Sequence, residues 1–244
     1  MKKAIIFASL FLVLTLTTSY AQDKKVAIVT FYIVKQIDLT DFDSAAQLAS
    51  MKLNDDPNFN MVPLLTEFHT RFFFDYAKAF PFQFLPEDQV ITNEAYKAYV
   101  PVGAVTEGPF KGMDTKYNIP VDGYKVVLPL MGHENERNLL AIFPQADGVM
   151  KIYINFSLVK VGFGGMGVVK VNAHANIALF NKNGDKVFSV KEDAKSKKVS
   201  PLVAGLPVMT PEKIYPMCES AMDELMQDIQ ADLPKMIRKT EAKL

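Results

Sequence analysis

The residues whose spacing most suggests chemistry are His133 and Glu134, which begin like the zinc-binding helix pattern His-Glu-x-x-His. That chemistry needs a second imidazole one helical turn after the first, because both ligands must face the same metal ion. Arg137 stands at that position. The other two histidines, His69 and His174, have no ligand spacing relative to His133. The sequence therefore predicts no metal site.

A second pattern suggests a cofactor, because residues 162–167 read Gly-Phe-Gly-Gly-Met-Gly and match GxGxxG. A dinucleotide site needs such glycines to open a helix, whose amino terminus holds the pyrophosphate. Here the following residues, 168–171, alternate as a strand does, so we expect a hairpin tip and no cofactor. The only cysteine, Cys218, lies on an apolar helical face and is expected to be a packed thiol rather than a nucleophile.

Acid and base residues do not form a recognisable catalytic set along the chain. A hydrolase site assembled from distant residues, such as His133, Glu134 and Asp147, stays open as an alternative, provided that these side chains converge. The aspartates of segment 38–43 lack the glycine and distal glutamate of a calcium loop, so they are predicted to form a turn and cap a helix. No catalytic residue is assigned.

The clearest candidate surface is one side of a predicted sheet over residues 149–190, where apolar and polar residues alternate. Such a pattern indicates an antiparallel meander with one buried and one wet face. The wet face is either an ordinary solvated surface or a binding surface. Its candidate binding residues are Tyr153, Asn155, Lys170, Asn172, His174 and Asn176.

The elements that would position this surface indicate an α/β (α+β) fold, with a mixed sheet, a C-terminal antiparallel meander and helices mainly on one face. Segment 25–35 is continuously apolar and predicts a buried central strand. Segment 62–80 predicts a helix with an aromatic stripe, in which His69 is expected to be a partly buried histidine bonded to a neighbour and Phe74 to point away. Residues 22–244 are expected to form a single domain.

The remaining segments predict shorter elements. Residues 100–132 are rich in proline and glycine and predict an irregular insertion containing one strand at Tyr124–Leu128. We also expect a strand within 81–86, helices at 92–99 (capped by Thr92 or Asn93), 134–143 and 210–233, a last meander strand at 187–190 and a charged loop at 191–198. The last helix starts at Thr210 or near Tyr215, and Pro234 is expected to kink or end it.

The first 21 residues predict a secretory signal peptide. Lys2 and Lys3 precede an apolar run from Ala4 to Leu16, and small residues precede a cleavage site after Ala21. The run is shorter than the roughly 20 residues that a membrane-spanning helix needs. We expect a periplasmic or secreted protein that begins at Gln22. It is not expected to be a lipoprotein, because a lipoprotein needs a cysteine at that position.

Charge argues against several classes of partner. The chain has 27 basic and 27 acidic residues, and removing Lys2 and Lys3 leaves the mature chain with a net charge of about −2. This balance gives no reason to expect binding to nucleic acid or to an anionic membrane surface. No segment after the leader predicts a transmembrane helix.

The order of these elements resembles the small α/β domain of the TolB amino-terminal region and of CsgG-like bacterial envelope proteins. The resemblance rests on the strand KVAIVTF, the helix LLTEFHTRFFFDYAKAF and the turn at Ala146-Asp147-Gly148 that leads into a long strand. It implies a non-enzymatic envelope protein that works through protein–protein contacts. The chain departs from that group in lacking a lipidation cysteine and in carrying residues 100–132.

Taken together, the sequence predicts an exported, soluble, non-enzymatic binding or assembly module of the bacterial cell envelope, whose partner is another envelope protein. The contact surface would be the wet sheet face or the insertion. Besides the hydrolase, one alternative stays open: a small-molecule or lipid carrier in which the aromatic helix and the sheet enclose an apolar pocket.

Overall fold

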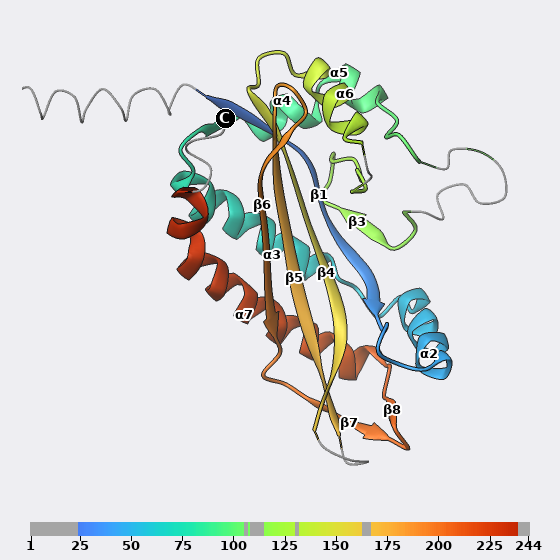
Figure 1. The fold of residues 1–244 in the computed structure, drawn as a ribbon. Helices are drawn as coiled ribbons and strands as arrows, with labels where there is room; N and C mark the ends of the chain where they lie inside the picture. The colour runs from blue at the N-terminus through green and yellow to red at the C-terminus, as the bar shows by residue number, and fades with distance from the viewer. Residues whose placement is uncertain (1–23, 105–106, 108–114, 130–131, 163–166, 239–244) are drawn as a thin grey trace, which may run out of the picture.

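The computed structural model describes residues 24–104, 107, 115–129, 132–162 and 167–238. The predicted signal peptide lies outside these residues. The structure confirms the predicted α/β class with a mixed sheet, in which four long strands run side by side (Figure 1). The strands are β1 (Lys25–Asp38), β2 (Gln83–Phe84), β3 (Asn118–Pro120), β4 (Gly148–Val161), β5 (Val168–Asn181), β6 (Lys186–Lys195), β7 (Ser200–Val203) and β8 (Leu206–Pro207).

The sheet is mixed because β1 pairs in parallel with β2 and β4, whereas β4, β5 and β6 form an antiparallel meander. The order along the sheet is β2-β1-β4-β5-β7-β8, with β3 paired to β1 and β6 paired to β5. The first eight residues after Lys25 in β1 are all buried, as expected for a central strand covered on both faces. In β4 and β5 only alternate side chains are fully buried over most of the length, which confirms the predicted meander.

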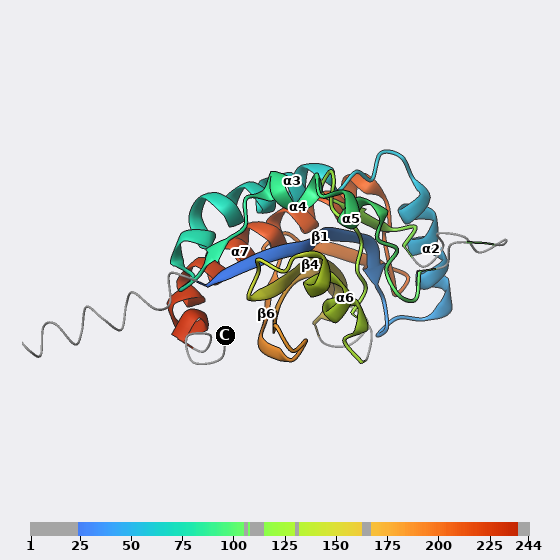
Figure 2. The same cartoon turned by 90° about the horizontal axis from the view of Figure 1, so that it is seen from above.

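Two long helical segments cover one face of the sheet, and a short helix covers part of the other (Figure 2). α7 packs against β5 and β6, and α3 packs against β1 and α7. α6 lies on the opposite face, against β4. The helices are α2 (Ser44–Asp55), α3 (Val62–Arg71) with its continuation η1 (Phe72–Tyr76) and η2 (Ala77–Ala79), α4 (Glu87–Ile91), α5 (Glu94–Ala98), α6 (Glu134–Ile142) and α7 (Pro211–Arg238).

The aromatic stripe predicted for residues 62–80 is core. Phe68, Phe72 and Tyr76 are buried, and the ring of Phe31 on β1 packs against Phe68 and Phe72. The helix does not remain regular throughout, because its last turns change to π and then 3-10 geometry. Phe74 points away from the stripe as predicted and is 69% exposed.

The strand predicted at Tyr124–Leu128 is wrong; the insertion contributes β3 at Asn118–Pro120 instead. The backbone between Tyr124 and Leu128 is bonded to side chains rather than to a neighbouring strand. Lys125 donates its N–H to the Tyr96 hydroxyl (2.8 Å), and its carbonyl accepts from the Thr30 hydroxyl (2.6 Å). Tyr124 and Val127 are buried in the common core, so this part of the insertion belongs to the fold.

Two boundaries near the end of the chain also differ from the prediction. The loop expected at 191–198 is largely strand, because β6 continues to Lys195 as an edge strand that keeps charged side chains on its outer face. α7 does not end at Pro234 but continues to Arg238. Its continuation is stabilised by burial, since Leu233 and Ile237 on either side of the proline are both in the core.

One helix that the sequence did not predict, α2, follows the aspartate-rich turn. The predicted capping role of that turn is confirmed, because the Asp43 carboxylate accepts from the Ala46 N–H at 3.0 Å. We expect Asp43→Ala to lower the free energy of unfolding by about 1 kcal/mol in urea titrations. Asp41→Ala, which removes an exposed carboxylate that caps no helix, is expected to change it by less than about 0.5 kcal/mol. Equal effects of the two changes would contradict the capping role.

Candidate functional site

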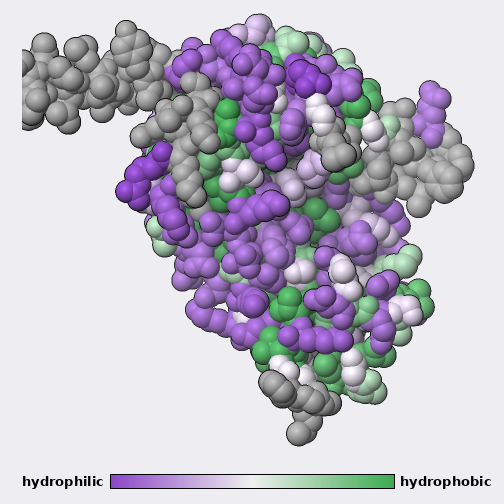
Figure 3. Space-filling model, viewed as in Figure 1, coloured by the Kyte–Doolittle hydropathy of each residue, from purple (hydrophilic) through white to green (hydrophobic). Residues whose placement is uncertain are grey.

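The six predicted surface residues lie on one face of the β4–β5 pair. The register places Tyr153 opposite Asn176 and Asn155 opposite His174. Further along β5 on the same face, Asn172 lies opposite Ser157, and Lys170 lies opposite Val159. This face is turned to the viewer in Figure 3 and is largely hydrophilic. The structure thus places all six residues in one row, with Lys170 next to Asn172 and farthest from Asn176.

Hydrogen bonds fix most of the polar side chains of this row. Asn176 donates to the Asn155 side chain (3.0 Å), and the His174 Nε2 lies 2.9 Å from the Ser157 hydroxyl oxygen. The Asn172 amide donates to Asp193 on β6 at 3.1 Å. Held side chains lose little conformational freedom when a ligand contacts them, which favours binding over a disordered solvated surface.

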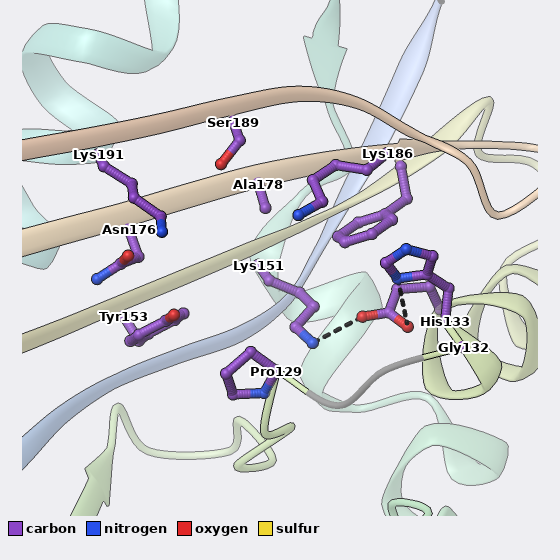
Figure 4. Close-up of a pocket in the computed structure, with 12 residues that line it drawn as sticks. Pro129, Gly132, His133, Lys151, Tyr153, Asn176, Ala178, Lys186, Ser189 and Lys191 are labelled. Atoms are coloured by element: carbon purple, nitrogen blue, oxygen red, sulfur yellow. Dashed lines mark hydrogen bonds and ion pairs between the residues drawn. The ribbon is translucent and has the colours of Figure 1, made fainter.

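A pocket opens at the end of this row nearest α6 (Figure 4). Its volume is about 430 Å³, within the range of small-molecule sites. It lies between β4, β5 and β6 and the start of α6. The lining residues are Pro129, Gly132, His133, Glu136, Lys151, Tyr153, Asn176, Ala178, Phe180, Lys186, Ser189 and Lys191. Two of the predicted surface residues, Tyr153 and Asn176, are therefore pocket residues.

The pocket contains a buried ion pair between α6 and β4. The Lys151 Nζ lies 2.7 Å from the Glu136 carboxylate, and both side chains are only 3% exposed. The ammonium group also donates to the Leu128 carbonyl at 3.1 Å. Burial lowers the pKa of Lys151, and the Glu136 carboxylate opposes that shift. Because desolvating two charges is costly, this pair is better explained by a role in the site than by a gain in stability.

His133 borders the pocket in an unusual backbone conformation. It precedes α6 with φ of 52°, in the left-handed region that non-glycine residues seldom adopt. Its Nδ1 lies 4.0 Å from the Glu136 carboxylate, which is too long for a hydrogen bond, and that nitrogen is buried without a hydrogen-bond partner. A strained residue with an unsatisfied polar atom is typical of functional sites.

The distant hydrolase set is not assembled. Asp147 contacts the amino end of β1 and the β5–β6 turn, with its carboxylate 2.9 Å from the Lys25 N–H and 3.2 Å from the Lys182 ammonium group. Among the described residues, no hydrogen bond or ion pair joins Asp147 to His133 or Glu134. His69 is partly buried, and its Nε2 lies 2.7 Å from the Glu87 carboxylate, in agreement with its predicted structural role. This hydrogen bond lowers the pKa of Glu87.

Sequence reasoning missed the residues that the pocket does bring together, namely Glu136, Lys151, Lys186 and Lys191. One signal was present: Lys151 precedes Tyr153 and Asn155 at the same alternation, so it belongs to the same face. Glu136 is one turn into the helix that follows His133. Nothing in the spacing shows that this helix crosses the sheet at Lys151, since the contact joins separate elements.

The other patterns considered in the sequence do not form functional sites among the described residues. The Cys218 thiol is buried in the core, and burial raises its pKa. The glycines of residues 163–166 lie outside the described residues, but they join Val161 to its antiparallel partner Val168, so a strand follows them and no helix does. In the described part of the chain, no group of three or more histidine, cysteine and acidic residues could hold a metal ion. Nor is any helix there long and apolar enough to cross a membrane.

The predicted polar face gives a test by pH. Burial lowers the pKa of His174 below its ordinary value of 6.5, with the Asp193 and Asp38 carboxylates opposing the shift. The unfolded chain therefore takes up this proton first as the pH falls, so the free energy of unfolding decreases below about pH 6.5. We expect an NMR titration of the imidazole to show a midpoint below 6.5, and His174→Gln to remove this part of the pH dependence. A midpoint at or above 6.5 would contradict the burial of His174.

No protein-family model and no curated protein sequence matches the chain. Among solved structures, it is similar to a neuraminyllactose-binding hemagglutinin homolog from Helicobacter pylori, with 12% identity and a TM-score of 0.36 over 90% of this chain and 88% of that one. Lipoprotein GNA1162 from Neisseria meningitidis gives 14% identity and a TM-score of 0.27 over 84% and 99%. The hypothetical protein CT253 from Chlamydia trachomatis gives 9% identity and a TM-score of 0.30, over 86% of this chain and 97% of that one. Scores this low carry no argument about function, and the resemblance to the TolB and CsgG-like domain stays a prediction.

Proposed function

We propose that the chain is an exported, non-enzymatic binding module of the bacterial cell envelope that takes its ligand in the pocket on the polar sheet face. The observation that carries the proposal is the pocket itself, about 430 Å³ in volume, at the end of a row of hydrogen-bonded polar side chains. Two residues of the predicted binding surface, Tyr153 and Asn176, line this pocket. Export is supported by the predicted leader, with its basic start, apolar run and small residues before Gln22.

Binding is a better interpretation of the pocket than catalysis. The Glu136 carboxylate is already engaged by Lys151, and the His133 imidazole is too far from it to be oriented as a general base. No hydroxyl or thiol that lines the pocket is hydrogen-bonded to a base among the described residues. The side chains present are suited to hydrogen bonding and charge pairing with a polar ligand.

The pocket also differs from the lipid-carrier alternative. That alternative needs an apolar cavity between the aromatic helix and the sheet, where the rings of Phe72, Phe80 and Phe84 pack against one another with centroids 5.5 to 6.2 Å apart. The pocket lies on the opposite face and is bordered by charged groups. A polar small molecule fits this lining better than a lipid chain does.

The test is native mass spectrometry of the protein recovered from the envelope of its own host. We expect a wild-type population carrying a bound small mass, because the pocket would retain its ligand. Ala178→Trp fills the pocket and is expected to abolish the bound mass, whereas Ala141→Trp adds the same side chain on the exposed side of α6 and is expected to retain it. Equal ligand occupancy in both variants would contradict the pocket as the site. The same spectrum tests export, since the mature chain is expected to begin at Gln22.

A protein partner from the envelope is a second candidate, favoured by the part of the row beyond the pocket. There Asn172 and His174 are held by Asp193 and Ser157, at positions where no pocket residue lies. If a partner docks there, His174→Ala is expected to weaken its capture while leaving small-ligand occupancy unchanged, since His174 is half-buried and does not line the pocket. Undiminished capture would remove this candidate.

A further inference from the structure

The charges around the pocket are unequal. Three lysines and one glutamate line it, which leaves a formal charge of +2 when His133 is neutral. The Glu136 carboxylate is already paired with the Lys151 ammonium group. Lys186 and Lys191 both come from β6, and neither has an ion-pair partner among the described residues. The chain as a whole has 27 basic and 27 acidic residues, so this concentration of positive charge is local.

The two unpaired lysines extend over the pocket rather than away from it. Figure 4 shows the ammonium group of Lys191 beside Asn176, and that of Lys186 beside Ala178. The charge on Lys186 adds to the lowering of the Lys151 pKa, behind burial, so the two groups repel each other. Like charges held around one space favour an anion in that space, since it converts the repulsion into attraction.

Lysines on an edge strand have a simpler use, which is to oppose pairing with another chain. Lys195 fits that use, since it is exposed on β6 and is not among the residues that line the pocket. Lys186 and Lys191 differ from it in lining the pocket together with apolar surface. The ring of Tyr153 is held there by stacking on Tyr32, with centroids 5.2 Å apart and planes within 8°. Phe180 and Pro129 complete the apolar part.

We infer that the pocket binds a small organic anion, a molecule with a carboxylate or phosphate group attached to an aromatic or similarly flat apolar body. Lys186 and Lys191 hold the anionic group, and the rings of Tyr153 and Phe180 contact the body. The Glu136–Lys151 pair keeps Lys151 at the pocket floor as a hydrogen-bond donor without adding net charge. This inference rests on the proposed function and names the class of its ligand.

The test measures binding by isothermal titration calorimetry with three probes: phenyl phosphate, inorganic phosphate and benzyl alcohol. We expect phenyl phosphate to bind wild-type protein most tightly, because it alone offers both the charge and the flat body. Its affinity is expected to fall with added salt. Lys186→Gln/Lys191→Gln should weaken it by about tenfold or more, since charge-assisted bonds are lost.

The matched control is Lys195→Gln/Lys213→Gln, which removes the same charge from exposed positions outside the pocket. It is expected to leave the affinity within about twofold. All four lysines are exposed, so both double variants should fold, and their thermal unfolding midpoints verify this. Equal weakening by the two double variants would overturn the inference, as would absence of phenyl phosphate binding to the wild type. Benzyl alcohol binding as tightly as phenyl phosphate, and lost in Ala178→Trp, would overturn the anionic class and leave the proposed function standing.

Discussion

Glu136→Gln is expected to lower the free energy of unfolding by about 3 to 5 kcal/mol, because it leaves the Lys151 ammonium group buried without a counter-charge. Both side chains of the pair are only 3% exposed, so water cannot replace the lost carboxylate without opening the pocket floor. Glu134→Gln is the control, since it removes an exposed carboxylate from the same helical turn. It is expected to change stability by less than about 0.5 kcal/mol.

The pH dependence of Glu136→Gln distinguishes an unpaired charge from a packing defect. Burial already lowers the pKa of Lys151, and loss of the opposing carboxylate lowers it further. In the unfolded chain the lysine keeps its proton up to its ordinary pKa of 10.5. Between the lowered pKa of the folded state and 10.5, the unfolded state therefore binds more protons, and the free energy of unfolding rises with pH. The difference in free energy of unfolding between Glu136→Gln and the wild type should therefore shrink as the pH approaches 10.5. A deficit that is constant with pH would contradict the burial of charge.

A double variant separates the pair from its members. Glu136→Leu/Lys151→Met replaces both charges by apolar groups, and a buried ion pair replaced in this way usually costs little or nothing. We expect it to recover most of the stability lost in Glu136→Gln and to lose the binding of phenyl phosphate. That combination would show that the pair is kept for the site rather than for the fold. Retained binding of phenyl phosphate would instead show that the ion pair has a structural role only.

Phe72→Ala is expected to lower the free energy of unfolding by about 3 to 5 kcal/mol, the usual cost of emptying an aromatic core position. Phe72 is buried, and its ring contacts Phe31 on β1 and Phe84 on β2 as well as its helical neighbours. Truncation therefore opens a cavity between the helix and the sheet that rigid rings cannot refill. Chemical denaturation of the purified protein measures the loss.

The control lies two residues away in the same π-helical segment. Phe74 is 69% exposed, and the Lys78 ammonium group lies 4.5 Å from its ring centroid. Phe74→Ala is expected to cost less than about 1 kcal/mol. A small loss in Phe72→Ala, together with tighter binding of a fatty acid probe, would favour the lipid-carrier alternative over a filled core.

Periodicity predicted the elements whose residues face one environment along their length. The alternation through Ile152, Ile154 and Phe156 gave β4 and its partners, and the 3.6-residue stripe containing Phe68 and Phe72 gave α3. It failed where tertiary contacts replace local structure. Tyr124–Leu128 looks like a strand, yet its backbone is bonded to the side chains of Thr30 and Tyr96, which no local pattern contains.

The site was predictable only in part for the same reason. Tyr153 and Asn176 were recognisable because each lies on a face that the alternation defines. Glu136 and Lys151 were not, because their contact depends on where α6 is placed over β4. Lys186 and Lys191 resemble ordinary edge-strand lysines in the sequence, and only the pocket shows that they face a common space.

Amide NMR mapping of a bound ligand tests the polar-face pocket most directly. Isotope-labelled protein would be titrated with the small-molecule fraction of its host's envelope, and the residues whose resonances shift would be assigned. The expected result is a set of shifts concentrated at Lys151, Tyr153, Asn176, Ala178 and Ser189, which surround the pocket. Shifts confined to α2 or α7, with these five residues unchanged, would show that the ligand binds elsewhere.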